Sequence, residues 1–362
     1  MQLGIVGLPS SGKSTLFQAV TRTHLDNAAI AKTEAHLGVV RVPDERLDRC
    51  SAIFSPKSTV YATIEFVDVA GLKKGASGTT QFTTGFLSAV KTNDALIQVV
   101  RLFANDAVPH LDGNIDPLRD VATLEAEFIL ADMAVLESRI EKIHKQLGRT
   151  PHDEPMKREL PVLEKCLALL EAEKPLRNED LSREELHILK TYQLLSLKPM
   201  LIALSLDESQ QSIKDEEISR VAAAKAGLST RVVAFFGKID MEMSELSADD
   251  ARLFMDEYGI RESALDTLIR EAYALLGLQS FLTVGEDECR AWTIRTGMTA
   301  QEAAGVIHSD FVTKFIRAEV VHYDDFIAAG GSFAKAKEAG HWRLEGKGYE
   351  VKDGDIMNIR HG

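Results

Sequence analysis

One stretch decides the fold of this chain: Gly7-Leu8-Pro9-Ser10-Ser11-Gly12-Lys13-Ser14-Thr15, which fits the pattern G-x-x-x-x-G-K-[ST]. The apolar run 3–6 before it predicts a buried strand, and the residues after it predict a helix that ends near Thr23. A strand, a glycine turn and a helix N-terminus in this order direct backbone N–H groups at one anion, as in a phosphate loop. The alternative, a glycine-rich turn that binds nothing, is disfavoured because the motif is complete and correctly placed.

The residue types within this loop predict its chemistry. Lys13 is expected to reach the β- and γ-phosphates of a nucleotide, and Ser14 is expected to ligate Mg²⁺ through its hydroxyl. The predicted nucleotide-binding residues of the loop are Pro9, Ser10, Ser11, Gly12, Lys13, Ser14 and Thr15.

Composition restricts the class of protein. The chain has 362 residues, of which 45% are hydrophobic and 27% charged, and this predicts a soluble globular protein with two or three domains. No apolar run approaches the ~20 residues of a membrane span, so no membrane association is expected. Met1-Gln2 leads directly into a predicted strand without a basic segment, so we expect no signal peptide. Cys50, Cys166 and Cys289 match neither a zinc spacing nor a disulfide framework, which favours the reducing cytoplasm.

A second motif follows a predicted strand. Residues 37–42 and 59–67 predict strands, and the second continues into Asp68-Val69-Ala70-Gly71. In a nucleotide switch the Asp of D-x-x-G holds Mg²⁺ through water, and the Gly N–H contacts the γ-phosphate. The motif is weak alone and becomes strong at a strand end after a phosphate loop. Thr33 is the candidate that completes the magnesium shell, and an ordinary loop threonine is the alternative.

The middle of the chain predicts a helical hairpin. Apolar residues recur at helical spacing from Val121 to Leu147, which predicts a long amphipathic helix that stops near Gly148. A second helical pattern begins at Leu160 and ends near Pro175. Two long helices joined by a short polar loop form an antiparallel hairpin inserted in the nucleotide domain.

The tip of this hairpin carries a local excess of positive charge. The formal net charge of the whole chain is −13, which argues against a generally nucleic-acid-binding surface, so any RNA contact must be local. Six Lys or Arg stand against three Asp or Glu between residues 139 and 158, namely Arg139, Lys142, Lys145, Arg149, Lys157 and Arg158. The cluster is either an RNA contact or a solvated helix end.

The remaining segments predict the end of one domain and a second, smaller one. Further strands are predicted at 94–101, 199–204 and 230–236, with helices near 251–258 and 264–275. No N-K-x-D motif of a guanine site occurs in the chain, and Ser205-Leu206-Asp207-Glu208 stands where a base would be read. The strand-rich segment after Leu278 predicts a small α+β domain.

Taken together, these motifs resemble the YchF/Obg-like ATPases, a branch of the Ras-like P-loop GTPases. The resemblance covers nearly the whole chain, and its most specific part is the C-terminal segment. It is carried there by Arg290-Ala291-Trp292-Thr293, Asp310-Phe311, Phe315-Ile316-Arg317-Ala318-Glu319-Val320, Trp342-Arg343-Leu344-Glu345-Gly346-Lys347 and Asp353-Gly354-Asp355.

This resemblance implies an α/β fold with three parts. A Ras-like P-loop NTPase domain is expected at 1–120 and 199–277, and the inserted antiparallel helical hairpin at 121–198. A small C-terminal α+β domain of the ubiquitin-like TGS type is expected at 278–362.

The resemblance also implies a function. It predicts a slow Mg²⁺-dependent nucleoside triphosphatase in the cytoplasm that prefers ATP to GTP and acts as a molecular switch on the ribosome. The hairpin and the TGS domain are the expected contacts with the ribosome or its RNA, although the C-terminal segment is net acidic.

The resemblance agrees with the site residues that the motifs indicate. Ser205, Leu206 and Glu208 are expected to read the base, and Gly71 to contact the γ-phosphate. The family usually has N-x-x-E at the base loop, and Ser205 replaces that Asn, so both ATP and GTP stay open as substrates.

The resemblance further names a catalytic candidate. Leu72 stands where Ras-like enzymes place a water-orienting Gln, and His110 matches the histidine that this family is thought to use instead. A loop histidine without a catalytic part is the alternative. At the level of function, the alternative is a regulatory nucleotide-binding module with incidental hydrolysis. A nucleotide kinase is disfavoured, because the chain has D-x-x-G and lacks an Arg-rich lid segment.

Overall fold

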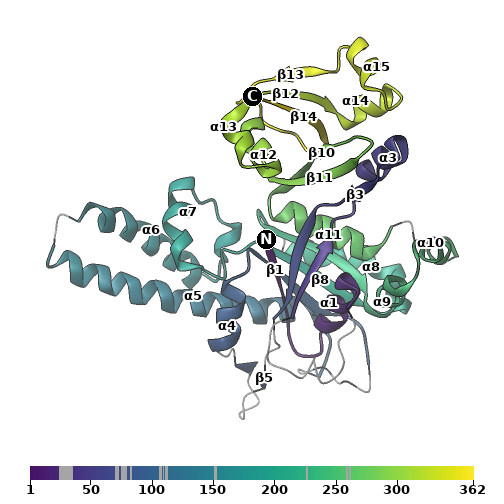
Figure 1. The fold of residues 1–362 in the computed structure, drawn as a ribbon. Coiled ribbons are helices and arrows are strands. Elements are labelled where there is room, and N and C mark those ends of the chain that lie inside the picture. The colour runs from purple at the N-terminus through teal and green to yellow at the C-terminus, as the bar shows by residue number, and fades with distance from the viewer. Residues whose placement is uncertain are drawn as a thin grey trace. The chain divides into compact units, whose positions relative to one another are not determined.

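The computed structural model describes residues 1–23, 36–69, 73–74, 80–81, 84–105, 108, 110, 113–150, 153–225, 227–257, 260 and 262–362. The chain divides into two compact units (Figure 1). The first contains Met1–Gly38 and Glu65–Leu275, and the second contains Val39–Ile64 and Leu276–Gly362.

The first unit is built on a six-stranded sheet with the strand order β2-β4-β1-β7-β8-β9. Its strands are β1 (Gln2–Val6), β2 (His36–Arg41), β4 (Thr63–Asp68), β7 (Ala95–Arg101), β8 (Met200–Leu206) and β9 (Thr230–Phe236). β1 pairs in parallel with β4 and β7, and β8 pairs in parallel with β7 and β9. Every residue of β7 and β8 is buried, as expected for strands covered on both faces.

Helices cover both faces of this sheet. They are α1 (Lys13–Thr21), α4 (Thr84–Lys91), α5 (Pro117–Leu147), α8 (Lys214–Lys225), α9 (Gly237–Glu245), α10 (Ala248–Glu257) and α11 (Ala264–Leu275). Side chains of α4, α5 and α8 form one core with sheet residues such as Val100 and Ile202. α11 contacts β8 and β9, and none of its residues belongs to that core. Since successive strand residues point to opposite faces, α11 lies on the other face.

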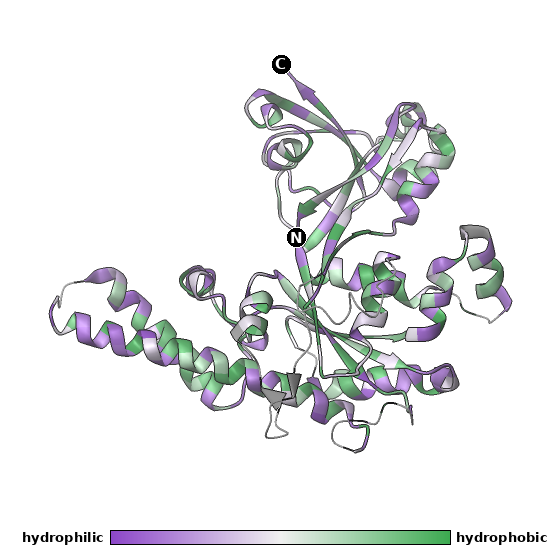
Figure 2. Ribbon diagram, turned by 60° about the horizontal axis from the view of Figure 1, so that its bottom comes forward, coloured by the Kyte–Doolittle hydropathy of each residue, from purple (hydrophilic) through white to green (hydrophobic). Residues whose placement is uncertain are grey.

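The predicted hairpin is confirmed as α5 and α6 (Glu154–Glu171). Asp116 caps α5 by accepting a hydrogen bond from the Arg119 N–H at 3.1 Å, and Asp153 caps α6 through the Met156 N–H at 3.2 Å. Figure 2 shows that the sheet strands are predominantly hydrophobic, whereas the far end of the hairpin is predominantly hydrophilic. Although α5 spans 31 residues, no helix in the described part of the chain is long and apolar enough to cross a membrane.

After the hairpin the chain returns to the sheet through short helical segments. These are a 3-10 turn η1 (Leu176–Asn178), α7 (Arg183–Leu189) and η2 (Lys190–Tyr192). Another 3-10 segment, η3 (Glu208–Ile213), follows β8 and leads to α8. In η1 the Arg177 side chain is only 2% exposed and forms an ion pair with Glu125 of α5. Its guanidinium also donates to Thr230 Oγ1 at 3.1 Å and to the Ser196 carbonyl at 3.3 Å. Arg177 therefore connects the hairpin, the returning segment and β9.

The second unit is a small α+β domain, as predicted, with the strand order β13-β12-β14-β10-β11-β3. Its strands are β3 (Ser58–Val60), β10 (Leu278–Thr283), β11 (Glu288–Arg295), β12 (Phe315–His322), β13 (Arg343–Glu345) and β14 (Asp355–His361). Its helices are α3 (Glu45–Phe54), α12 (Ala300–Ile307), α13 (Asp310–Lys314), α14 (Tyr323–Ala328) and α15 (Phe333–Glu338). Thr299 and Glu302 form a capping box at the start of α12, where the sequence predicts a Thr cap.

Residues Val39–Ile64 differ from the sequence-based expectation. The sequence places them in the nucleotide domain and predicts one strand over 59–67, but the structure has two strands, β3 and β4, in different sheets. β3 pairs in parallel with β11, and Phe54 of α3 stacks on Phe326 with ring centroids 6.0 Å apart. β3 and β11 are far apart in the sequence, so the residues around either strand carry no signal that the two strands pair.

We expect Glu125→Ala to lower the free energy of unfolding by about 3 kcal/mol, because it leaves the buried Arg177 guanidinium without its counter-charge. Urea unfolding followed by circular dichroism measures this change. The control is Lys165→Ala, which removes the pair between Lys165 and Glu185 at 2.7 Å, where the Lys165 side chain is 44% exposed. It should leave stability essentially unchanged. Equal stability of the two variants would contradict the role assigned to Arg177.

Candidate functional site

The predicted nucleotide-binding residues gather where the parallel strands of the first unit end. β1 runs into the phosphate loop after Val6, β4 ends at Asp68, and β8 ends at Leu206. Ile5 pairs with Asp68 and Arg101 pairs with Ser205, so these strand ends lie along one edge. In parallel α/β sheets this carboxyl edge is where ligands bind.

The two glycines of the loop are required by close packing against neighbouring strands. Gly7 has φ +150°, and a Cβ there would lie 2.4 Å from the Val99 carbonyl oxygen of β7. Gly12 has φ +103°, and a Cβ there would lie 2.9 Å from Ser205 Oγ of β8. At Gly7 the close atom is backbone, so no other residue type fits there without moving β7. At Gly12 the Ser205 hydroxyl can rotate away, and the positive φ is what favours glycine. The curl of the loop is therefore fixed by its contacts with β7 and β8.

Helix α1 begins directly behind this curl with its first N–H groups available. Gly12 is the N-cap residue and provides no side-chain hydrogen bond. Capped helices such as α5 satisfy these groups with a carboxylate. An uncapped N-terminus that follows a glycine turn is an anion-binding site, because unpaired N–H groups and the helix dipole both favour negative charge.

The ammonium of Lys13 is buried beneath the loop. Its Nζ donates to the carbonyl oxygens of Gly7 at 3.0 Å and Leu8 at 2.7 Å. Burial lowers the pKa of Lys13 from 10.5 to about 8, and the nearby Asp68 carboxylate opposes this shift. The positive charge is thus poorly compensated inside the protein, which favours an incoming anion.

Asp68 occupies the position predicted for the acid of the D-x-x-G motif. Burial raises the pKa of its carboxyl group, and the charges of Lys13 and His36 oppose this rise. Ser14, which follows Lys13 in α1, is half-buried. A hydroxyl and a carboxylate are hard oxygen donors that fit Mg²⁺.

Two predicted residues of this site cannot be placed. Thr33 and Gly71 lie outside the described residues, as does Leu72. Among the residues that are described, no group of three or more His, Cys, Asp or Glu side chains could hold a metal ion. Magnesium at this site would therefore depend on hydroxyl, water and phosphate oxygens, which is the usual coordination of this ion beside nucleotides.

Two of the residues predicted to read the base, Ser205 and Leu206, end β8, and both are buried. The Ser205 carbonyl accepts hydrogen bonds from the N–H groups of Leu102 at 2.9 Å and Phe103 at 3.3 Å. Its hydroxyl faces Gly12. Ser205 thus lies between the phosphate loop, which its hydroxyl faces at Gly12, and the residues after β7, which donate to its carbonyl.

Glu208 lies on the exposed first turn of η3. Asp207 caps this turn and donates its own N–H to Gln210 Oε1 at 2.8 Å. The Gln210 amide in turn donates to the Leu102 carbonyl at 3.0 Å. The exposed Glu208 carboxylate is therefore carried on a turn that is anchored to the end of β7.

Sequence reasoning missed the residues at the end of β9. A Cβ on Gly237 would lie 3.4 Å from Thr15 Cγ2 and 3.8 Å from Ser205 Oγ, so this glycine lies beside the loop. Asp240 accepts a hydrogen bond from the Phe236 N–H at 2.7 Å, and burial raises its pKa to about 6. The signal in the sequence is a glycine directly after the last predicted strand.

His110 lies beside the phosphate loop. It lines a small cavity of about 10 Å³ together with Leu8, Pro9 and Ser11 of the loop and with Asp120 of α5. The histidine ring is 8% exposed, and its Nε2 lies 2.9 Å from Asp120 Oδ2. The structure therefore brings the predicted catalytic residue to the loop and adds Asp120, which the sequence did not reveal.

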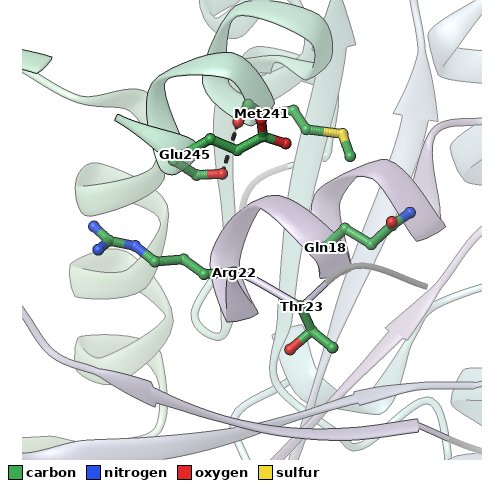
Figure 3. Close-up of a pocket in the computed structure, with 6 residues that line it drawn as sticks. Gln18, Arg22, Thr23, Met241 and Glu245 are labelled. Atoms are coloured by element: carbon green, nitrogen blue, oxygen red, sulfur yellow. Dashed lines mark hydrogen bonds between the residues drawn. The ribbon is translucent and has the colours of Figure 1, made fainter. Parts of the chain in front are cut away.

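A second hollow, of about 220 Å³, lies at the other end of α1 (Figure 3). Gln18, Arg22 and Thr23 line it from the C-terminal part of α1 and the residues after it, and Met241 and Glu245 line it from α9. Because the phosphate loop precedes the N-terminus of α1, this hollow is separate from the predicted site.

Comparison with protein families matches two parts of the chain. A family model described as "50S ribosome-binding GTPase" matches residues 2–131. The YchF-GTPase_C model, described as "Protein of unknown function (DUF933)", matches residues 278–362. The first match includes the phosphate loop and Asp68, and the second coincides with the C-terminal part of the second unit.

Whole-length relatives carry a common name. A Bacillus subtilis (strain 168) protein named "Ribosome-binding ATPase YchF" is 42% identical over 361 residues, covering 99% of this chain and 98% of that protein. A protein of the same name from Escherichia coli O157:H7 is 40% identical over 98% of each chain. The solved structure of the Schizosaccharomyces pombe YchF GTPase has a TM-score of 0.86 at 32% identity, and covers 99% of this chain and 97% of that one.

Burial of Lys13 predicts how the affinity for a nucleoside triphosphate depends on pH. Because the pKa of Lys13 is lowered to about 8, the amine loses its proton as pH rises through this value. Affinity should then fall by up to about tenfold per pH unit above pH 8, and binding should take up protons from solution. Calorimetry in two buffers of different ionisation enthalpy measures this uptake. Binding at about pH 8.5 without proton uptake would contradict the buried ammonium.

Proposed function

The chain belongs to the YchF family, as its motifs predicted, and from this premise we propose that it is a slow, magnesium-dependent nucleoside triphosphatase. In this proposal it prefers ATP to GTP and acts as a ribosome-associated switch in the cytoplasm. The observation that carries the proposal is the buried ammonium of Lys13 under a loop whose glycines pack against β7 and β8. The names of the curated relatives support ATP and the ribosome as its ligands.

We assign the binding steps to residues at the strand ends. Lys13 exchanges its bonds with the Gly7 and Leu8 carbonyls for phosphate oxygens, while the N-terminal N–H groups of α1 bind the same phosphates. Ser14 and Thr33 would bind Mg²⁺ directly, and Asp68 would bind it through water. When bound, the ion would supply positive charge that neutralises the phosphate oxygens. Gly71 contacts the γ-phosphate, so that the segment after it responds to hydrolysis.

His110 is proposed to position the attacking water. It lies beside Leu8, Pro9 and Ser11 of the phosphate loop, and Leu72 offers no hydrogen bond for this purpose. Phosphoryl transfer depends mainly on positioning and on stabilisation of charge. Without a Gln after the glycine of the D-x-x-G motif, the enzyme should be slow until a partner accelerates it.

Base selection is assigned to the loop after β8. Ser205 supports the phosphate loop at Gly12, and the exposed Glu208 is the group that can accept a hydrogen bond from the exocyclic amine of adenine. The Glu208 side chain is one methylene longer than the Asp of N-K-x-D, so its carboxylate does not reproduce the two-point guanine contact in the same geometry. This favours ATP, with GTP as the second candidate.

Calorimetric titration of ATP and GTP in the presence of magnesium tests the proposal. We expect tighter binding of ATP, and turnover that rises when ribosomes are added. Absence of affinity for either nucleotide would overturn the whole assignment, and tighter binding of GTP would overturn the base preference. Turnover that ribosomes leave unchanged would favour the alternative, a regulatory module in which hydrolysis is incidental.

The hairpin tip and the second unit are the proposed ribosome contacts, the latter as a TGS-type docking domain. In the tip cluster, Arg139 bridges to Glu159 of α6 at 2.7 Å, and Lys157 pairs with Glu154 at 3.1 Å. Lys142 and Arg149 are exposed at the end of α5 and just after it. Arg158 of α6 is exposed as well, so cations accessible to RNA phosphates lie on both helices of the tip.

Reversal of Lys142, Lys145 and Arg149 to Glu should weaken co-sedimentation with ribosomes and reduce its dependence on salt, because each lost phosphate contact lowers the slope by about one unit. The control variant reverses Lys174, Arg183 and Lys190, which are exposed elsewhere in the inserted region and change the net charge equally. Equal co-sedimentation of both variants at every salt concentration would refute the contact.

A further inference from the structure

The ring of His110 is held at both nitrogens by residues of the first turn of α5. Its Nε2 lies 2.9 Å from Asp120 Oδ2, and its Nδ1 lies 3.5 Å from Nη2 of Arg119. The side chains of His110 and Asp120 are only 8% and 4% exposed. The histidine is therefore fixed by a buried carboxylate on one side and by a guanidinium on the other.

The Asp120 carboxylate is itself held in place. Its second oxygen, Oδ1, accepts hydrogen bonds from Arg119 Nε at 3.1 Å and from Arg119 Nη2 at 2.9 Å. Arg119 also donates to Asn114, to the side-chain oxygen at 2.7 Å and to the carbonyl at 2.8 Å. The carbonyl of Asp120 accepts from the amide of Gln98, a buried residue of β7, at 3.3 Å. These bonds leave Oδ2 directed at the histidine.

This arrangement selects one tautomer of His110. An ionised carboxylate only accepts hydrogen bonds and a guanidinium only donates them, so Nε2 carries the proton and Nδ1 carries the lone pair. Nδ1 is thus the nitrogen that can accept a hydrogen bond from a water molecule.

The two contacts differ in strength. The bond to Asp120 is short, buried and assisted by charge, whereas the contact to Arg119 is 3.5 Å long and the Arg119 side chain is 30% exposed. When one contact must open to admit water, the contact to Arg119 opens at the lower cost. Nδ1 then becomes accessible while Asp120 keeps the ring in place.

We propose that Asp120 is a positioning residue that sets the tautomer and the orientation of His110, so that Nδ1 faces the attacking water. This inference rests on the proposed function, in which His110 positions that water. In this inference Asp120 acts through the imidazole of His110.

The geometry predicts what Asp120→Asn does. Arg119 needs an acceptor, so the amide oxygen turns toward Arg119 and the amide NH₂ turns toward His110. Nε2 must then accept, and the proton moves to Nδ1, which is the wrong tautomer for accepting from water. We expect kcat to fall by about tenfold, the factor that one charge-assisted hydrogen bond represents, with KM for ATP unchanged.

The experiment combines single and double variants of the full chain. His110→Ala should lower single-turnover hydrolysis and spare ATP affinity, and adding Asp120→Asn to it should cause no further loss. Asp120→Glu should restore part of the activity, since it keeps the charge. The matched control is Asp132→Asn, a buried acid on the same helix that accepts from the Leu195 and Ser196 N–H groups, and it should leave kcat unchanged.

A spectroscopic measurement does not depend on activity. Nitrogen-15 NMR of histidine-labelled protein, assigned with His110→Ala, should show a protonated Nε2 and an unprotonated Nδ1 in the unmodified chain. Asp120→Asn should exchange the two signals. The unmodified protein alone tests the tautomer if the variant does not fold.

The outcomes separate this inference from the proposed function. Unchanged hydrolysis in His110→Ala would remove the histidine from the mechanism and overturn the proposed role of His110, whatever tautomer NMR reports. A loss in His110→Ala without a loss in Asp120→Asn, additive losses in the double variant, or a protonated Nδ1 in the unmodified chain would overturn the role of Asp120.

Discussion

The phosphate loop can surround the ammonium of Lys13 only because Gly7 and Gly12 have no Cβ. A side chain at Gly7 would collide with the backbone carbonyl of Val99, so the loop would lift away from β7. A side chain at Gly12 would be strained at φ +103° and would displace the Ser205 hydroxyl. The two carbonyls that hold Lys13 belong to the same curl. The position of the charge, the low pKa that burial gives it, and the uncapped start of α1 all depend on this one packing constraint.

Features that depend on neighbouring residues could be predicted from the sequence. The strand before the loop, the buried run of β7, the bounds of β9 and the cap at Thr299 follow from apolar runs, turn residues and capping chemistry. Lys13 and Asp68 could also be predicted, because their spacing to a glycine turn and to a strand end is local. The hairpin followed from helical periodicity, and the candidate role of His110 came from the resemblance to a known family.

Features that depend on distant residues could not be predicted. Nothing around Asp120 indicates that it meets His110, because the contact requires α5 to start beside the phosphate loop. The pairing of β3 with β11 and the position of Gly237 beside Thr15 are likewise products of the assembled sheets. Ser205 is an intermediate case. Its departure from the family motif is visible in the sequence, but its contact with Gly12 is visible only in the structure.

Two arrangements of charge flank the loop, and they differ in how completely they are balanced. The Asp120 carboxylate has Arg119 and His110 as close partners, so it is satisfied without any ligand. Lys13 and Asp68 influence each other through their charges. Burial lowers the pKa of Lys13 and raises the pKa of Asp68, so burial favours the neutral form of both groups. In the proposed function an anion bound to Lys13 weakens the effect of the Lys13 charge on the Asp68 carboxylate. A divalent cation beside Asp68 then supplies positive charge in its place. A nucleotide and its metal ion would then bind more strongly together than separately, because each supplies the charge that the other's protein partner lacks.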